Sequence, residues 1–301
     1  MLGWLLKYPP VTSAQNVFPP FVAEGRLLTR EFRTDTNLNC RTDASVVFLY
    51  SNGWWQVEAR YSYLHLARGI TNVESCMRIP DGTRSYIMFE GISNTGMTTA
   101  SACPNSFPPS GRSELLVPWL GLCPHPELPL IDGKRIRRFI NLPDYRPKIF
   151  NAPQNEGLYE AKYLAPEGDF LSELMVTNNG FGLELNVEKT SLEDEGTIQR
   201  YAPPFDNGYT ELHYKLIEST NLNGVTFPLR AVCERFSPNW GGKNRDDLRV
   251  GLLSELIVTR ISFSGKDVAR RIVAPSEMFA FDARPPNLKK TTADYVVHDD
   301  Q

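Results

Sequence analysis

Hydrophobic and polar residues alternate along much of this chain with the two-residue period of a strand that buries one face. The clearest stretch runs from Trp55 to Tyr63, where Gln56, Glu58 and Arg60 separate apolar or small residues. The same alternation returns in 181–188 and 211–217. A chain patterned in this way is expected to be mostly β.

Asn-Gly and Asp-Gly pairs stand between many of these stretches, and they are the strongest short-range signal for a hairpin turn. Four hairpins are predicted, with arms at 46–50 and 55–63, 76–79 and 86–89, 171–177 and 181–187, and 209–217 and 225–236. A last strand is expected over 252–263. Pro228 cannot donate to a ladder, so its strand should lie at an edge or contain a bulge.

Proline and glycine recur from end to end, with 23 and 21 copies, so a long helix cannot form. One short helix is predicted from Ser113, as its N-cap, to just before Gly121. Pro118 is expected to kink or shorten it. The preceding stretch, 95–109, is polar and proline-rich and predicts a long loop.

The 301 residues fit one large domain, because all-β domains often reach about 200–250 residues. We expect a β-rich domain over 17–283 and a polar tail over 284–301. Residues 1–16 are expected to be the remnant of an export signal or a disordered arm, since Thr12 to Asn16 resembles a small-residue cleavage site. No run approaches the length of a transmembrane helix. This pattern predicts a periplasmic or secreted protein whose signal is truncated here.

The charge and the cysteines of the chain limit the partners, disulfides and metal sites that we expect. A net charge of −3 with scattered bases predicts no nucleic-acid partner. The five cysteines include no C-x-x-C pair, and Cys103 and Cys123 bracket one loop as the best candidates for a disulfide. His125 and Cys123 would supply only two ligands, so no metal site and no cofactor is predicted.

No nucleophile elbow, zinc-protease helix or phosphate loop occurs, so no catalytic residue is assigned. A carboxylate pair of the kind that glycosidases use stays open, because spatial pairing cannot be seen in a sequence. Asp144, Glu156, Glu167 and Asp169 are the mid-chain acids from which such a pair could be built.

The order of elements resembles that of the LolA- and LolB-like bacterial lipoprotein carriers. The resemblance rests on an opening strand at 21–32, the hairpin over 46–63, a lid at 113–122, and the segment 223–228 followed by 252–263. It implies a single large antiparallel sheet curled into a half-open barrel, with a short helical lid over an apolar cavity. This chain differs in its greater length, its proline-rich insert and its extended tail.

From these observations we expect a non-enzymatic, extracytoplasmic protein that binds an apolar ligand or an envelope partner, the ligand being a lipid or a lipidated protein. The predicted lining consists of Trp55, Tyr61, Phe89, Leu116 and Trp119. A carbohydrate-active hydrolase that uses a carboxylate pair, and a structural or adhesive β module, are the alternatives. Oligomeric state is not predicted.

Overall fold

The computed structural model describes residues 18–32, 38–51, 53–63, 71–78, 84–90, 99–104, 113–126, 128, 133, 135–137, 156–164, 169–184, 197–238, 248–263, 278–282 and 295–297. The strands before the helix are β1 (Phe21–Phe32), β2 (Leu38–Ser51), β3 (Trp54–Tyr63), β4 (Thr71–Arg78), β5 (Arg84–Glu90) and β6 (Thr99–Pro104). The helix is α1 (Ser113–Leu122). After it come β7 (Arg135–Arg137), β8 (Glu156–Tyr163), β9 (Leu171–Asn178), β10 (Phe181–Glu184), β11 (Thr197–Arg200), the short 3-10 helix η2 (Phe205–Asn207), β12 (Thr210–Leu222), β13 (Val225–Pro238), β14 (Leu248–Ser262), β15 (Met278–Asp282) and β16 (Tyr295–Val297).

One sheet holds most of these strands, in the order β16-β15-β6-β5-β4-β3-β2-β1-β14-β13-β12-β9-β8-β7. It is antiparallel except where β15 pairs with β6. The end strands do not pair with each other, so the sheet is curled but open, and the predicted mostly β fold is confirmed. Among the described helices, none has the length and apolar content needed to cross a membrane.

Three of the four predicted hairpins are present. β2 pairs with β3 across Gly53, β4 pairs with β5, and β12 pairs with β13. In the last of these, Asn223 and Gly224 have φ of 54° and 83°, the left-handed geometry that an Asn-Gly turn supplies. Pro228 lies in an interior strand, opposite register shifts in β12 between Leu216 and Ser219. Of its two predicted settings, the bulge is therefore the one found.

The hairpin predicted around Asn179-Gly180 is wrong. β9 pairs with β8 and β12, whereas β10 pairs with β11 in a separate two-stranded sheet. At this point the chain is held by a distant segment: the Asn178 amide donates to Tyr209 O, and the Tyr201 amide donates to Gly180 O. A Cβ at Gly180 would collide with the carbonyl of Asp206. Tertiary contacts therefore redirect a turn that the local sequence would close.

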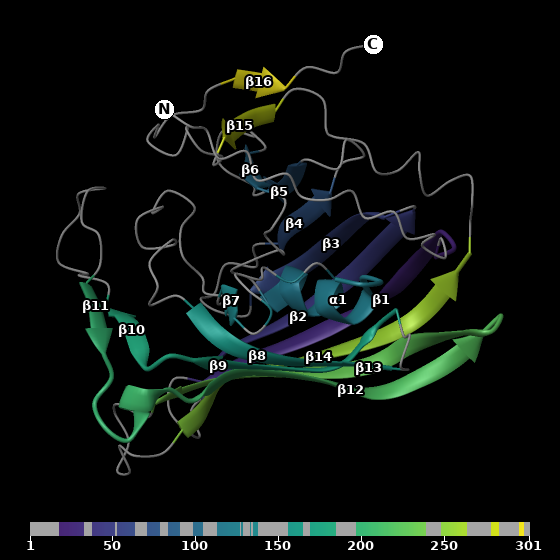
Figure 1. Cartoon of the computed structure of the whole chain (residues 1–301). Coiled ribbons are helices and arrows are strands. Elements are labelled where there is room, and N and C mark those ends of the chain that lie inside the picture. Colours follow the sequence, from purple (N-terminus) through teal and green to yellow (C-terminus); the bar gives the residue numbers. More distant parts are fainter. Residues whose placement is uncertain are drawn as a thin grey trace, which may run out of the picture.

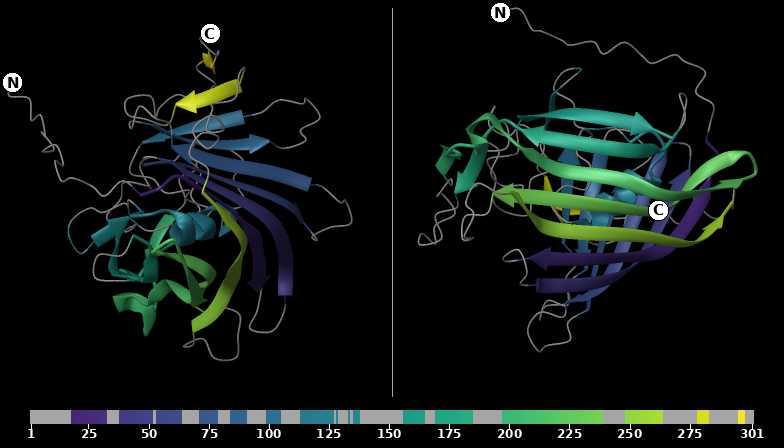
Figure 2. Two further views of the ribbon diagram at one scale, coloured as in Figure 1. Left: turned by 90° about the vertical axis from the view of Figure 1, so that its right-hand side faces the viewer. Right: turned by 90° about the horizontal axis from the view of Figure 1, so that it is seen from below.

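The sheet curves around α1, which lies on its concave side (Figures 1 and 2). α1 contacts β1, β2, β3, β4, β12, β13 and β14, so one helix spans strands from both halves of the chain. The main core cluster fills the space between them and draws on β1, β2, β3, β12, β13 and β14, together with β9. The position predicted for a lid is thus occupied by a packed helix.

A bulge in the middle of the sheet contributes to its curvature. The register of β1 and β14 shifts between Glu24 and Gly25, which leaves Thr259 unpaired in the ladder. Bulges increase local twist and bend the strand that contains them. A Cβ at Gly25 would meet the carbonyl oxygen of Ile257, so the close approach of the two strands requires glycine here.

β16 lies within the segment 284–301, for which a polar tail is expected. The division into a remnant, one domain and a tail stays a prediction. The predicted loop over 95–109 includes β6 at 99–104, and its other residues lie outside the described part of the chain.

Candidate functional site

The helix α1 is apolar around its whole circumference. Every residue from Glu114 to Leu122 is buried, and Glu114 is the one charged side chain among them. A helix that is apolar on all sides needs cover on all sides, as in the core of a larger protein. Because it lies against the concave face of an open sheet, its position depends on tertiary contacts rather than on its own polarity pattern.

The sequence of α1 provides little helix stability by itself. It has 10 residues, which is shorter than the roughly 12–15 that an isolated helix needs to be even marginal in water. Pro118 lies inside it and lacks the N–H that would bond to the carbonyl of Glu114. The helix continues one residue beyond Gly121, before which it was predicted to end, and a Cβ built on Gly121 would meet the side chains of Leu256 and Tyr214.

The C-terminal end of α1 is fixed to the turn between β8 and β9. The Cys123 amide donates to Trp119 O at 2.9 Å, and the His125 amide donates to Asp169 O at 2.6 Å. The exposed His125 ring also places Nε2 2.7 Å from Asp169 Oδ1. Two contacts between the same residues hold this end of the helix in place.

Four of the five predicted lining residues are brought together in the core cluster. Trp55 and Tyr61 come from β3, and Leu116 and Trp119 come from α1; each is at most 4% exposed. The rings of Trp55 and Trp119 are 5.9 Å apart between centroids, so β3 and the helix touch through their indoles. Phe89 belongs to β5, but its side chain lies outside the described residues.

One end of the site is an aromatic cluster that the predicted lining omits. Phe18 lies edge-on to four other rings, with centroid distances of 5.3 to 5.7 Å. Those rings belong to Phe21, Tyr50, Phe170 and Phe227. Phe18 and Phe21 form the ends of a Phe-Pro-Pro-Phe sequence, which is the only local signal for this cluster. Phe170 and Phe227 come from distant parts of the chain, and their partnership arises only on folding.

Two buried polar atoms in the site have no hydrogen-bond partner in the described part of the chain. They are Trp119 Nε1 on the helix and the hydroxyl of Tyr214 on β12. Burial raises the pKa of the Tyr214 hydroxyl above its ordinary value, and it raises the pKa of the neighbouring Cys233 thiol to about 12. Both groups are neutral at physiological pH, so neither acts as an ionised nucleophile.

The residues considered for metal binding or hydrolysis are placed elsewhere. Cys123 is buried and its thiol approaches the carbonyl of Pro124, whereas the side chain of Cys103, its candidate disulfide partner, lies outside the described residues. Asp169 pairs with His125, the side chain of Glu156 is not described, and Asp144 and Glu167 lie outside the described residues. Within the described ranges, no group of three or more His, Cys, Asp or Glu residues gathers in metal-binding geometry.

Neither the known family models nor the curated proteins include a match to this sequence. Two solved structures are similar in fold. A LolA superfamily protein from Nitrosomonas europaea has 11% identity over 82% of this chain and 86% of its own, with a TM-score of 0.31. A DUF1329 family protein from Desulfovibrio piger has 6% identity over 84% of this chain and 88% of its own, with a TM-score of 0.38. The predicted resemblance in architecture is therefore found, and at these values it says nothing about a ligand.

Proposed function

We propose that this chain is a non-enzymatic, extracytoplasmic binding protein that holds an apolar ligand between α1 and the concave face of the sheet. The observation that supports it is a short helix, apolar on all sides, packed into the hollow of an open apolar sheet. A ligand enters by taking over the contacts that α1 makes with the sheet. Trp55, Tyr61, Phe89, Leu116 and Trp119 line the site in this proposal.

The energetics favour a ligand with a long apolar chain. Six apolar side chains of α1 are buried, and exposing all of them would cost on the order of 10 kcal/mol. An acyl chain gains about 0.8 kcal/mol for each methylene group that it buries. About 12 methylene groups would therefore offset the opening of α1, whereas a small ligand would not.

The hinge for this movement is the C-terminal end of α1. His125 and Asp169 hold the C-terminal end to the turn between β8 and β9. Pro118 weakens the helix in its middle. We therefore expect α1 to move as a short lid that stays attached near His125, with the ligand passing beneath its N-terminal half.

The first test uses the chain purified without detergent. Native mass spectra are compared with denaturing spectra, and an organic extract is analysed for lipid. A stoichiometric lipid-sized adduct that is lost on denaturation supports the proposal. Incubation with a photoreactive fatty acid then maps the site, because crosslinks are expected in peptides that contain α1 and β3. Crosslinks confined to the opposite face of the sheet would contradict it.

A matched pair of variants tests the lining. Leu116→Asn replaces a buried leucine of α1 by a polar residue of similar size, and Leu158→Asn makes the same change at an exposed leucine of β8. Uptake of a fluorescent fatty acid should fall at least about tenfold in the first variant and stay unchanged in the second. Circular dichroism controls for folding. Equal uptake by both variants would exclude Leu116 from the lining.

The extracytoplasmic location is supported by the small residues of 12–16, which resemble an export cleavage site. Fractionation of cells that express the full-length gene product with a C-terminal tag tests it. The tag should appear in the periplasmic or secreted fraction, and recovery in the cytoplasm alone would refute the location.

A further inference from the structure

A row of polar side chains crosses the otherwise apolar concave face. Five adjacent strands, β2, β1, β14, β13 and β12, each contribute one member. The register pairs Thr29 with both Thr42 and Ser254, Ser254 with Cys233, and Cys233 with Tyr214. We call these five residues the polar row. All of them are at most 4% exposed.

A buried polar row is costly unless its groups form hydrogen bonds. Thr29 and Ser254 satisfy each other through their hydroxyls at 3.1 Å. The hydroxyl of Tyr214 has no partner in the described part of the chain, although its residue is fully buried. Apolar residues at these positions would avoid that cost, so the row calls for an explanation beyond packing.

The row divides the concave face by polarity. Towards the N-terminal end of β1, the next positions are Leu27, Leu256 and Ala231, and beyond them lies the aromatic cluster around Phe18. In the opposite direction, the next positions are the exposed Glu31 on β1, the half-buried Leu252 on β14 and Arg235 on β13, and the buried Leu212 on β12. Along β1 and β13 the face therefore changes from aromatic through aliphatic and neutral polar to charged, whereas on β12 it stays apolar beyond Tyr214.

The helix α1 covers the polar row at Gly121. The hydroxyl of Tyr214 would lie 3.2 Å from a Cβ built on Gly121, so it reaches the interface between α1 and the sheet. Gly121 therefore sets how close the helix can approach this hydroxyl. Movement of α1 would uncover the hydroxyl to any ligand that replaces the helix.

We infer that the ligand is a single-chain amphiphile with a carbonyl oxygen, a fatty acid or an acyl ester, whose carbonyl accepts a hydrogen bond from Tyr214 and whose chain runs towards the aromatic cluster. This inference rests on the proposed function and adds the class and direction of the ligand. A hydroxyl can donate to a carbonyl oxygen of either an acid or an ester. A pure hydrocarbon would leave the hydroxyl without a partner.

The experiment compares methyl palmitate with octadecane, which have similar chain lengths and differ in the ester group. Each displaces a fluorescent apolar probe from the detergent-free full chain. Tyr214→Phe keeps the ring and removes the hydroxyl. It should weaken the binding of methyl palmitate about tenfold and change that of octadecane by no more than about twofold. Tyr209→Phe is the control, because that hydroxyl donates to Tyr201 away from the row.

The outcomes separate the two proposals. If the wild-type chain binds neither compound, the proposed function fails and the inference fails with it. If it binds both and Tyr214→Phe changes neither, or weakens both equally, the proposed function stands and the inference is overturned. A urea titration of Tyr214→Phe supplies an independent readout: the midpoint should rise, because a buried hydroxyl without a partner is removed. A lower midpoint would show that the hydroxyl has a partner within the folded protein.

Discussion

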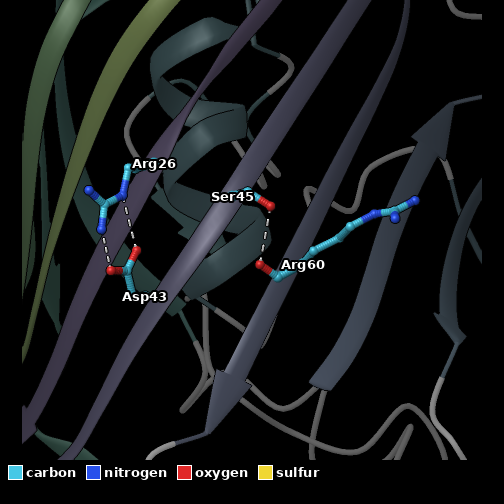
Figure 3. Close-up of polar contacts among 4 residues, drawn as sticks. All are labelled: Arg26, Asp43, Ser45 and Arg60. Carbon is cyan, nitrogen blue, oxygen red and sulfur yellow. Dashed lines mark hydrogen bonds and ion pairs between the residues drawn. The ribbon is translucent and has the colours of Figure 1, made fainter. Parts of the chain in front are cut away.

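The two faces of the curled sheet differ in how their side chains are satisfied. On the concave face, strands and helix pack aromatic and aliphatic residues into one cluster, and the polar row is the main interruption. On the convex face, ion pairs follow one another from β3 to β8, one of them within β3 and the others between neighbouring strands. These pairs are Glu58–Arg60, Arg26–Asp43, Glu24–Arg260, Arg230–Glu255 and the group of Lys162, Glu173 and His213. Figure 3 shows Arg26 beside Asp43, with the Ser45 hydroxyl next to the carbonyl of Arg60.

The difference explains how a large open sheet keeps its register. A slip of one residue would move the ion pairs into the core and the apolar residues into water. Among the described residues, Val22, Leu49 and Val47 form a small apolar cluster apart from the main core. The hollow side is therefore the face that offers an apolar ligand a continuous surface, and the charged side is the face that meets water.

Truncating leucines on the two faces tests this contrast with the largest expected effect. Leu174 is fully buried on the concave face of β9, and Leu158 is 58% exposed on the neighbouring strand β8. Leu174→Ala should lower the free energy of unfolding by about 2–5 kcal/mol. Leu158→Ala should change it by no more than about 0.5 kcal/mol. Urea titrations measure both, and similar losses would show that the convex side is also covered.

The bulge at Gly25 allows a test of the curvature that separates the faces. Gly25→Ala should lower the free energy of unfolding by about 1–3 kcal/mol, because the new methyl group meets the Ile257 carbonyl. Gly53→Ala is the control, since Gly53 has φ of 82° and open space around it, and its cost should be about 1 kcal/mol. If Gly53→Ala lowers the free energy of unfolding by more than Gly25→Ala does, the strands can separate at Gly25 at little energetic cost.

The sequence predicts those parts of the fold that depend on neighbours in the chain. The β12–β13 hairpin follows from alternation and from the Asn223-Gly224 turn, both of which are local signals. The polar row could not be predicted, because its central hydrogen bond joins residues 225 positions apart. Nothing local in 252–263 indicates that this strand lies between β13 and β1. The features that could not be predicted depend on the register between distant strands rather than on strand propensity.

Lowering the pH should weaken the ion pairs of the convex face before it affects the apolar contacts of the concave face. Hydrogen bonds from Lys162 and then His213 lower the pKa of Glu173 from 4.5 to about 2. Between these values the unfolded chain binds a proton that the folded chain does not, so stability from Glu173 is present above about pH 4.5 and is lost as the pH falls towards 2. Because the half-buried Glu173 side chain still contacts water, the effect should be modest.

Glu173→Gln tests this titration. The urea midpoint of the wild-type chain should decrease on going from pH 5 to pH 3 by more than that of the variant, because the variant has no carboxylate to protonate there. Parallel curves for the wild type and Glu173→Gln would contradict the assigned role of Glu173.

The smallest effect is expected from the ion pair between Arg26 and Asp43. Asp43 raises the pKa of the Arg26 guanidinium by a hydrogen bond, but both side chains are open to solvent, so exposure and salt screening weaken the pair. Arg26→Gln should leave the urea midpoint within experimental error at about 1 M salt and lower it only slightly at low salt. A large loss at both salt concentrations would mean that the convex charges hold the sheet together. In that case, packing in the concave cluster would contribute less to the free energy of unfolding, and moving α1 would cost less than its buried area implies.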